Sequence, residues 1–409
     1  MAQESIRVDV GIVGGGPAGL MAALLLKRRG INAAVVERRS EDQIYRTHRA
    51  GILEAGTVEM LVQSEIDSRV LTHGHEHRGT VLSFNGQRQR IDFQDLVGRS
   101  VWLYPQNEVF LDLATAWQRE GGAIFWSADH VEVHGVDSTH PSITFHDSAE
   151  DQRTIEAELI IGADGSRSSC RRLIPESVRT DYFTSYPYAW FGILCEAPPT
   201  AAELIYANSD VGFALISQRN ERVQRMYFQC DPDTDPEEWT DEEIFDHIQR
   251  VLGENGDVRL KRGPIIERTV LPFRSYVCDP LTFGRLVLAG DAGHTVPPTG
   301  AKGLNLAFSD VRALVPEIAE FLGRLRGAAP GGGATALEEP LLRYSRTALD
   351  RVWKAQNFSY WATNLLHREP GDDAFAQRRR RGEFDAITGS RYGRAFFADC
   401  YTGWTGDWK

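Results

Sequence analysis

The chain has 409 residues, of which 42% are hydrophobic, and a formal net charge of −12. Its length allows roughly two to three domains, and its acidic balance argues against nucleic acid as a partner. No run of about 18 apolar residues is present, so we expect no membrane-spanning segment. The five cysteines are scattered and lack metal-site spacing, which predicts free thiols, no bound metal and a cytoplasmic protein.

The N-terminal region predicts an α/β unit that binds a nucleotide. Residues 8–13 form a short apolar strand, residues 20–28 a helix and residues 33–36 a second apolar strand. A glycine-rich turn, GGGPAG, joins the first strand to the helix. This order of elements is typical of the Rossmann-like fold. A signal peptide is disfavoured by Asp9 and by the lack of a small-residue cleavage site.

The glycines of this turn have the spacing of a dinucleotide-binding motif. Gly14, Gly16 and Gly19 follow the pattern GxGxxG, which allows a tight turn, close approach of the backbone to a pyrophosphate and close helix–strand packing. Glu37 ends the second strand, where its carboxylate can accept a hydrogen bond from a ribose hydroxyl. We therefore predict a dinucleotide site. The alternative is a glycine-rich turn in an α/β unit that binds nothing.

The middle of the chain predicts a mostly antiparallel sheet. An apolar strand at residues 158–162 first precedes Asp164 and Gly165. From about residue 180 the pattern then changes to strands with short polar turns, at residues 188–195, 202–206, 212–219 and 223–230. A helix near residues 241–252 follows before the chain returns to the first unit.

A second strand–turn–helix signal lies at residues 286–310. The apolar run 286–289 ends on Gly290 and Asp291, and a turn rich in proline and glycine then opens into an amphipathic helix. A phosphate or ribose can bind there, because unpaired N–H groups point outward at a helix N-terminus. With the N-terminal turn, this pattern predicts a flavin enzyme. The chain has a single dinucleotide motif, so it binds either FAD alone or a second nucleotide without its own Rossmann unit.

The predicted fold class is α/β with α+β elements. A Rossmann-like FAD-binding domain is expected over residues 1–180, continued by residues 285–350, with a substrate-binding sheet domain over residues 181–284. Residues 328–335 are predicted to form a flexible loop, and a long amphipathic helix is predicted at about residues 338–366. Residues 351–409 are expected to form a helical C-terminal interface segment.

A cluster suited to a carboxylate is predicted on the middle sheet. Ser217 and Arg219 lie two residues apart on one strand, and Arg225 and Tyr227 two apart on the next. Alternation places each pair on a single face, and Tyr206 on the preceding strand can join them. Two guanidiniums, a hydroxyl and a phenol would then converge on an anion that arginine binds in a bidentate manner. The alternative is a solvated hairpin face that carries arginines.

Motifs along the whole chain resemble those of a known family. They are GGGPAG, RAGILE at 49–54, the Asp-Gly element at Asp164, ELIYAN at 203–208, GFALISQR at 212–219, GDAGHTVPPTGAKGLNLA at 290–307 and the C-terminal Tyr401. By these motifs the sequence resembles the p-hydroxybenzoate hydroxylase family of class A flavoprotein aromatic monooxygenases. ELIYAN and GFALISQR are the discriminating motifs, since many flavin hydroxylases share the glycine-rich elements.

The resemblance implies noncovalent FAD and a set of residues around it. Glu37 would hold the adenosine ribose and Arg49 the pyrophosphate. Gln106 and Asp291 would also contact FAD, and the backbone of residues 300–305 would face the flavin ring. The implied FAD-binding residues are Gly14, Gly16, Gly19, Glu37, Arg49, Gln106, Asp164, Asp291, Gly300, Lys302, Gly303, Leu304 and Asn305.

The resemblance also implies roles around the substrate. Ser217, Arg219 and Tyr227 would bind the carboxylate of an aromatic acid. The carbonyl of Pro298 would face the phenol of the substrate, and Arg225 would help to choose between two flavin positions.

A proton path from the substrate phenol is implied as well. Tyr206 would hydrogen-bond the phenol, Tyr401 would lie behind it, and His77 would pass the proton toward solvent. An electrophilic flavin peroxide attacks a phenolate far faster than a phenol, yet a phenol with a pKa of about 10 is almost wholly protonated at neutral pH. A hydrogen bond to the charged form favours that form. Without the resemblance, the tyrosines would be read as core residues and His77 as a surface histidine beside His73 and His75.

These implications give one leading function and two rivals. The leading function is hydroxylation of 4-hydroxybenzoate at C3 to 3,4-dihydroxybenzoate, with NADPH or NADH and O2 as co-substrates, in a homodimer. A near rival is the same chemistry on 4-aminobenzoate or 3,4-dihydroxybenzoate. A distant rival is a flavin-binding sensor without turnover, which would need no path for a proton.

Two departures from the family pattern affect the prediction. Met226 stands where the best-known member of the family has a tyrosine, and strand alternation predicts that it faces away from the pocket. Residues 38–48 also differ, and in this family they set the choice between NADPH and NADH. Cations there favour the 2′-phosphate of NADPH, and this segment carries Arg38, Arg39 and Arg46. Acids oppose it, and the segment also carries Glu41 and Asp42. Gln43 stands in place of an aromatic residue expected from the family. We predict that both coenzymes work, with a modest preference at most.

Overall fold

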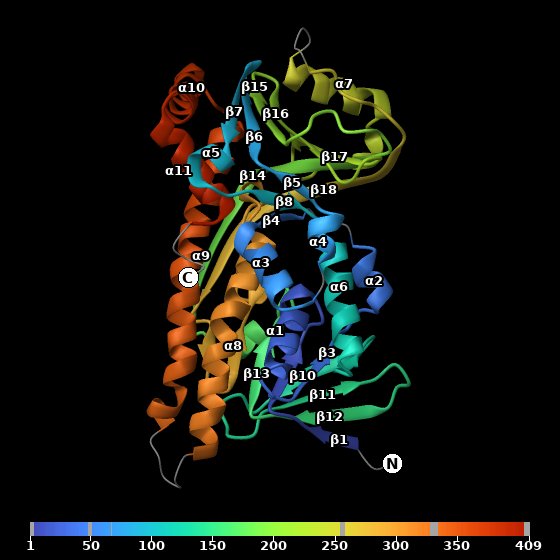
Figure 1. The fold of residues 1–409 in the computed structure, drawn as a ribbon, viewed down its shortest axis with the longest axis vertical. Helices are drawn as coiled ribbons and strands as arrows, with labels where there is room; N and C mark the ends of the chain where they lie inside the picture. The colour runs from blue at the N-terminus through green and yellow to red at the C-terminus, as the bar shows by residue number, and fades with distance from the viewer. Residues whose placement is uncertain (1–3, 48–50, 67, 254–257, 328–333, 405–409) are drawn as a thin grey trace.

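The computed structural model describes residues 4–47, 51–66, 68–253, 258–327 and 334–404. In Figure 1 the lower part of the molecule holds a parallel sheet with its helices, and the upper part holds a larger, mostly antiparallel sheet. One long helix, α9 (Ala334–Leu366), runs along both parts (Figure 1). The fold is therefore α/β with α+β elements and a helical C-terminal segment, as the sequence predicts.

The lower part is built on a six-stranded sheet. All neighbouring strands in it are parallel except β19 and β20, which form an antiparallel pair at one edge. In spatial order the strands are β19 (Thr282–Phe283), β20 (Leu286–Leu288), β13 (Leu159–Gly162), β2 (Val10–Val13), β3 (Ala33–Val36) and β9 (Ala123–Phe125). Every residue of β2, β3, β13 and β20 is buried, because helices cover a sheet of this kind and leave its strands uniformly apolar.

Three helices pack together over this sheet. Helix α1 (Pro17–Lys27) contacts both α6 (Gln106–Arg119) and α8 (Gly303–Gly327), and α8 in turn packs along α9. A small four-stranded sheet lies at the lower right of the molecule in Figure 1. Its order is β1 (Glu4–Arg7), β12 (Gln152–Glu156), β11 (Ser142–His146) and β10 (Asp129–His134).

The upper part is built on an eight-stranded sheet. Its strands pair antiparallel except β15 and β6, which are parallel. In spatial order they are β21 (His294–Thr295), β18 (Ile265–Asp279), β14 (Thr180–Cys195), β17 (Gln224–Cys230), β16 (Gly212–Gln218), β15 (Ile205–Ser209), β6 (Gly79–Phe84) and β7 (Gln87–Asp92). Strands β6 and β7 come from the first 180 residues, so two distant parts of the chain build this sheet.

The two faces of the eight-stranded sheet belong to different apolar cores. One face packs under α7 (Asp241–Leu252), in a cluster that includes Met226 and Phe228. The opposite face joins a cluster that includes Tyr206, Tyr227 and residues of α9. Met226 therefore faces away from Tyr206 and Tyr227, as strand alternation predicts.

A three-stranded sheet lies at the junction between the two parts (Figure 1), and several short helices are distributed over both parts. The sheet has the order β4 (Ile52–Glu54), β8 (Val101–Leu103), β5 (His75–His77). The short helices are α2 (Glu41–Tyr45), α3 (Ala55–Gln63), α4 (Arg69–Thr72), α5 (Phe93–Val97), η1 (Cys170–Leu173), η2 (Pro236–Glu238), η3 (Gly290–Ala292) and η4 (Pro298–Gly300). After α9, helices α10 (Ala374–Thr388) and α11 (Arg391–Thr402) fold back against the upper sheet (Figure 1).

Most predicted elements are present, with shifted ends. Helix α1 starts at Pro17 rather than residue 20, because proline is well suited to the first helical turn. Strand β14 starts eight residues before the predicted position, at Thr180, where its exposed residues pair with β18 and carry no apolar pattern. The strand predicted at 202–206 lies at Ile205–Ser209, so the predicted start was wrong. The hydrogen bonds to β6 begin only at the carbonyl of Leu204, which accepts the N–H of Val81.

Two further observations concern the chain as a whole. All five cysteines are free. Among the described residues, none of the helices is both long enough and apolar enough to cross a bilayer. The loop predicted at residues 328–335 lies mostly outside the described residues.

Candidate active site

The glycine-rich turn between β2 and α1 leaves an open face at the carboxyl end of the parallel sheet. Gly14 has a φ of +111°, and a Cβ at this position would lie 2.2 Å from the carbonyl oxygen of Ala163. A Cβ on Gly19 would lie 1.9 Å from the carbonyl oxygen of Gly14, so both positions require glycine. A Cβ on Gly16 would meet no other described atom within 4 Å. The turn therefore combines close packing with the free backbone that a pyrophosphate needs.

Glu37 lies beside this turn with its carboxylate already oriented. Its Oε2 accepts a hydrogen bond from the backbone N–H of Gly15 (2.8 Å), and its Oε1 accepts one from that of Arg39 (2.9 Å). A carboxylate has about four lone-pair sites, so the oxygens can still accept a ribose hydroxyl. Arg49, which the resemblance places at the pyrophosphate, lies outside the described residues.

A buried charged group holds the turn after β20. The N–H of Gly290 and Nε2 of His294 each lie 2.7 Å from Oδ2 of Asp310 on α8. Burial opposes a charge on His294, but the carboxylates of Asp310 and Asp291 together with hydrogen bonds outweigh burial and raise the pKa of the imidazole. These bonds fix the backbone on both sides of the half-buried Asp291.

Asp164 and Gln106 occupy different positions at the edge of this region. Both carboxylate oxygens of Asp164 accept hydrogen bonds from its own loop, among them the N–H groups of Ser169 (2.7 Å) and Cys170 (3.1 Å). Asp164 thus shapes the turn after β13, and a cofactor would meet the backbone of that turn. Gln106 is the first residue of α6 and is half-buried.

The loop before α8 is locked by the side chain of Asn305. Its Oδ1 accepts hydrogen bonds from the N–H of Glu54 (2.9 Å) and the hydroxyl of Thr57 (2.8 Å), and its Nδ2 donates to the carbonyls of Ile52 (2.9 Å) and Ala301 (2.8 Å). All the hydrogen-bonding capacity of this amide is used inside the protein. Asn305 therefore offers its backbone to a cofactor, and its side chain ties the loop to β4.

Lys302 extends the same bracing into the protein interior. Its Nζ donates to Oε1 of Glu54 (2.7 Å) and to the carbonyl of Tyr401 (3.0 Å), and all three side chains are buried. Gly300 has no room for a side chain, because a Cβ would lie 2.6 Å from Oγ of Ser359 on α9. Gly303 and Leu304, at the start of α8, are half-buried. The segment 300–305 therefore presents a fixed backbone.

Strand register brings the predicted substrate residues to one face of the eight-stranded sheet. Leu215 lies opposite both Tyr206 on β15 and Tyr227 on β17, and Ser217 lies opposite Arg225. Directly paired residues share a face, and residues two apart along a strand share it too. Tyr206, Ser217, Arg225 and Tyr227 therefore all face the core that α9 covers.

Of the two arginines of this cluster, Arg225 is buried and Arg219 is half-buried. Arg225 is 8% exposed, and its Nε and Nη1 have no hydrogen-bond partner among the described residues. Its guanidinium lies 5.2 Å from the ring centre of Tyr227. Arg219 donates from Nη2 to Oδ1 of Asn107 (2.7 Å), and burial together with the nearby charge of Arg225 lowers its pKa. Because unpaired buried charges are costly, this cluster is suited to an anion, and a carboxylate supplies acceptors for both guanidiniums.

We call Ser217, Arg219, Arg225 and Tyr227 the carboxylate clamp. Asn107, at the start of α6, is a partner that the sequence did not reveal, since no local pattern distinguishes it. Gly192 on β14 is a second residue that the sequence did not reveal. A Cβ there would lie 2.7 Å from Cε1 of Tyr227, so glycine makes room for the phenol ring.

Tyr206 and Tyr401 form a buried pair of phenols. Their hydroxyl oxygens lie 2.8 Å apart, and both side chains are buried. Burial raises the pKa of Tyr206, an effect that the hydrogen bond from Tyr401 opposes, and burial raises the pKa of Tyr401 as well. Both groups therefore stay protonated at neutral pH and can exchange a proton between them along one hydrogen bond.

His77 is buried at the junction of the two parts of the molecule. Neither ring nitrogen has a hydrogen-bond partner among the described residues. Burial lowers the pKa of His77 to about 4, so the ring is neutral at pH 7. The structure thus joins Tyr206 to Tyr401 directly, whereas His77 hydrogen-bonds to neither of them.

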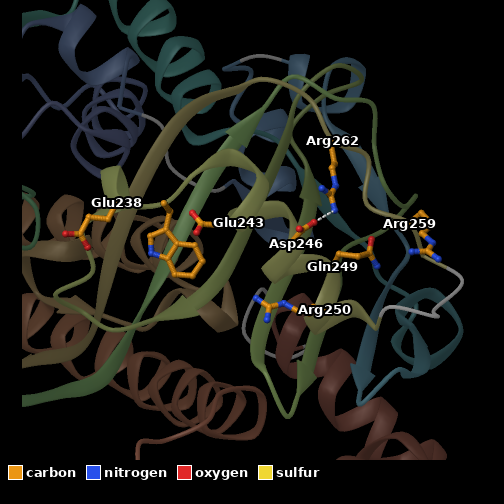
Figure 2. Close-up of a pocket in the computed structure, with 8 residues that line it drawn as sticks. Glu238, Glu243, Asp246, Gln249, Arg250, Arg259 and Arg262 are labelled. Atoms are coloured by element: carbon orange, nitrogen blue, oxygen red, sulfur yellow. Dashed lines mark hydrogen bonds and ion pairs between the residues drawn. The ribbon is translucent and has the colours of Figure 1, made fainter.

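An open hollow of about 760 Å³ lies elsewhere, beside α7 (Figure 2). Its lining is charged and includes the ion pair of Arg262 and Asp246, 2.7 Å apart. Helix α7 covers the face of the sheet that carries Met226, opposite the carboxylate clamp. This hollow is therefore separate from the candidate active site.

Comparison with known proteins supports a flavin site. Residues 7–359 match a family model described as "FAD binding domain". The chain is 37% identical over 401 residues to p-hydroxybenzoate hydroxylase of Acinetobacter baylyi, which covers 98% of this chain and 96% of that protein. A more distant relative is 3-(3-hydroxy-phenyl)propionate/3-hydroxycinnamic acid hydroxylase of Mycolicibacterium gilvum, with 28% identity over 76% of this chain and 53% of that protein.

Solved structures share the fold at low sequence identity. The structure of p-nitrophenol 4-monooxygenase PnpA from Pseudomonas putida aligns with a TM-score of 0.79 at 18% identity, and the alignment covers 98% of this chain and 99% of that one. A ternary complex of aklavinone-11 hydroxylase with FAD and aklavinone aligns with a TM-score of 0.69 at 20% identity, over 90% and 70% of the two chains. At this identity the likeness concerns the fold alone.

Proposed function

The chain belongs to the FAD-binding flavoprotein aromatic monooxygenases, and from this premise we propose that it hydroxylates 4-hydroxybenzoate at C3. The product is 3,4-dihydroxybenzoate, and NAD(P)H and O2 are the co-substrates. The observation that carries the proposal is a single sheet face on which the buried Arg225, with two unpaired nitrogens, lies on the same side as the Tyr206–Tyr401 phenol pair.

The residues at the carboxyl end of the parallel sheet are suited to FAD. Gly14, Gly16 and Gly19 give the turn a bare backbone for the pyrophosphate, and Glu37 can accept a ribose hydroxyl. The braced segment 300–305 would lie along the flavin through its backbone. Bound FAD supplies the redox chemistry that takes electrons from NAD(P)H and activates O2.

The chain's own residues would position and activate the aromatic acid. Arg219 and Arg225 neutralise its carboxylate, with hydroxyl groups of Ser217 and Tyr227 as further partners. The phenol at the other end of the ring then donates its proton to Tyr206, which passes one to Tyr401. Loss of this proton makes the ring electron-rich at C3, and the buried site excludes bulk water. The carbonyl of Pro298 would face the same phenol.

Beyond Tyr401, the proton would leave through His77. His77 would accept it, because neither nitrogen of its neutral ring has a hydrogen-bond partner among the described residues. A base with a pKa of about 4 holds a proton only briefly, which suits a relay to solvent rather than a store.

One assay decides between the proposed substrate and its rivals. Purified protein with FAD is given NADH or NADPH and a panel of 4-hydroxybenzoate, 4-aminobenzoate and 3,4-dihydroxybenzoate, and oxygen uptake and products are measured. We expect a yellow protein that forms 3,4-dihydroxybenzoate from 4-hydroxybenzoate. A protein that binds FAD but turns over none of these acids would instead favour a flavin-binding sensor. A protein that takes up no FAD would refute the whole proposal.

We further propose that the protein is a homodimer. Tyr392 and Phe396 lie one turn apart on α11 and are 88% and 50% exposed. Large exposed aromatic side chains that share a helix face are typical of protein contacts. Light scattering coupled to size exclusion tests this state, and a monomer at micromolar concentration would refute it.

A further inference from the structure

A continuous chain of buried hydrogen bonds links the eight-stranded sheet to the loop before α8. Nε1 of Trp190 on β14 donates to Nε2 of His367 (2.7 Å), just beyond the end of α9. Nδ1 of His367 lies 2.9 Å from the carbonyl of Thr363, and the hydroxyl of Thr363 lies 3.0 Å from that of Thr299. All four side chains are at most 2% exposed. We call these four residues the Trp190–Thr299 chain.

Each end of this chain contacts the candidate active site. The ring of Trp190 packs against that of Tyr227 in the carboxylate clamp, with centroids 4.7 Å apart. Thr299 follows Pro298 in η4, directly before the segment proposed to face the flavin. The chain therefore connects the group that would hold the substrate carboxylate to the loop that would face the substrate phenol.

Hydrogen-bonding chemistry admits only one form of His367. The indole of Trp190 only donates, so Nε2 must accept; the carbonyl of Thr363 only accepts, so Nδ1 must donate. The ring is therefore neutral and protonated on Nδ1, in agreement with its pKa, which burial lowers to about 3. Neither bond forms if the ring turns over, so the chemistry fixes the ring's orientation.

Aromatic packing holds the same ring on both sides. Tyr188 stacks on His367 with centroids 5.0 Å apart and an interplanar angle of 7°, and Phe213 lies 4.2 Å away. The neighbouring backbone is also tied to the sheet: Nδ2 of Asn208 donates to the carbonyl of Leu366 at 2.6 Å. The C-terminal end of α9 is thus a rigid support for β14.

We propose that His367 is a positioning residue for hydroxylation, which fixes the spacing between the carboxylate clamp and the Pro298 loop through Trp190 and Thr363. The inference rests on the proposed function. A benzoate held at its carboxylate presents C3 at a distance set by this spacing. Because reaction geometry is sensitive to displacements of about 1 Å, a looser spacing should waste activated oxygen as hydrogen peroxide.

The test compares His367→Phe with a matched control, His247→Phe. Phenylalanine keeps the ring stacking but removes both hydrogen bonds of His367. His247 also packs against aromatic rings, those of Phe228 and Trp239, but on the opposite face of the same sheet. The measured quantities are FAD affinity, the dissociation constant of 4-hydroxybenzoate and the hydrogen peroxide released per O2 consumed.

We expect His367→Phe to bind FAD like the wild type and to release about fivefold more peroxide per O2, whereas His247→Phe should resemble the wild type. Trp190→Phe and Thr363→Val break the chain at other links and should also uncouple. Their double variant should be no worse than the more affected single variant, because a chain broken once no longer transmits the constraint.

Three results would overturn the inference. The first is a folded His367→Phe with wild-type coupling, the second is equal uncoupling in His247→Phe, and the third is additive effects of Trp190→Phe and Thr363→Val. If His367→Phe does not fold, the Trp190 and Thr363 variants decide the matter. Failure of the proposed function is recognised separately, because then the wild-type enzyme itself neither binds nor hydroxylates the benzoate, and the inference falls with it.

Discussion

At the scale of single residues, the candidate site depends on guanidinium and phenol groups that are wholly or partly buried. Arg225 is buried with two unpaired nitrogens among the described residues, and Arg219 donates a hydrogen bond to the neutral amide oxygen of Asn107. We therefore expect an anion to bind strongly here, because among the described residues neither guanidinium donates a hydrogen bond to a carboxylate. The phenols of Tyr206 and Tyr401 share a direct hydrogen bond in this core.

Replacing Arg219 should weaken substrate binding and leave FAD bound. Loss of one partner of a buried charge pair costs about 2–5 kcal/mol, so Arg219→Ala should raise the dissociation constant of 4-hydroxybenzoate more than about tenfold. Arg222→Ala is the matched control, because Arg222 lies on the same hairpin and is exposed. Titration followed by flavin absorbance measures both constants. An unchanged constant in Arg219→Ala would place the carboxylate elsewhere.

Replacing Tyr206 should separate binding from hydroxylation. Tyr206→Phe keeps the carboxylate clamp, so the substrate should still bind and the flavin should still be reduced. The phenol of the substrate loses its path to Tyr401, so oxygen should be released largely as hydrogen peroxide. Tyr186→Phe is a control in the same core, since its hydroxyl pairs with Ser275 instead. Full coupling of O2 uptake to product in Tyr206→Phe would contradict the proposed activation.

At the scale of elements, we expect the charges on helix α2 to set the preference for NADPH or NADH. Ser40 and Gln43 form a capping box at its start, so Gln43 has a structural role where the family relative has an aromatic. Arg46 is paired with Asp42 at 2.8 Å, and Arg39 with Glu37 at 3.3 Å. Both cations are thus partly neutralised, which agrees with the prediction of a modest coenzyme preference.

Removing the acid from α2 should favour NADPH. In Asp42→Asn, Arg46 loses its ion-pair partner and can attract the 2′-phosphate, so the ratio of kcat/KM for NADPH to that for NADH should rise about fivefold. The double variant Asp42→Asn/Arg46→Ala should lose this gain. Steady-state kinetics with each coenzyme measures the ratio. A ratio that does not respond to Asp42→Asn would mean that α2 does not face the coenzyme, and a wild-type ratio beyond about a hundredfold would refute the shared use of both.

At the scale of the whole molecule, three of the described histidines are wholly or partly buried and have lowered pKa values. Burial lowers the pKa of His77 and of His247 to about 4 and that of His367 to about 3. The unfolded chain, with an ordinary histidine pKa of about 6.5, binds protons that the folded protein does not. The stability that these groups contribute is therefore fully present above pH ~6.5 and is lost as the pH falls toward 4.

The protein should accordingly be sensitive to mild acid. We expect the melting temperature of the FAD-bound enzyme to fall between pH 7 and pH 5, before most carboxylates titrate. His247 is the one of these three histidines that lies away from the proposed active site. His247→Phe should therefore reduce the fall in melting temperature. Thermal unfolding in buffers of equal ionic strength measures this. An equal fall in the variant would show that other groups set the acid response.

Local patterns were enough to predict much of this protein. The GxGxxG spacing, the buried strand before Gly290 and the apolar runs of β2 and β3 reflect short-range constraints, so they identify a nucleotide-binding α/β unit directly from the sequence. Alternation along β16 and β17 likewise placed Ser217 and Tyr227 on one face and Met226 on the other. These features depend on residues near in the chain.

Only the tertiary structure decided which distant residues meet. Asn107 reaches Arg219 from α6, Tyr401 reaches Tyr206 across 195 positions, and His367 reaches Trp190 across 177. No local period encodes such contacts, because they arise from how a sheet and three helices pack. The sequence by itself therefore determined the cofactor-binding unit and the sheet face that carries the clamp. The packing of α9 and α11 against that face determined the buried phenol pair and the support behind the clamp.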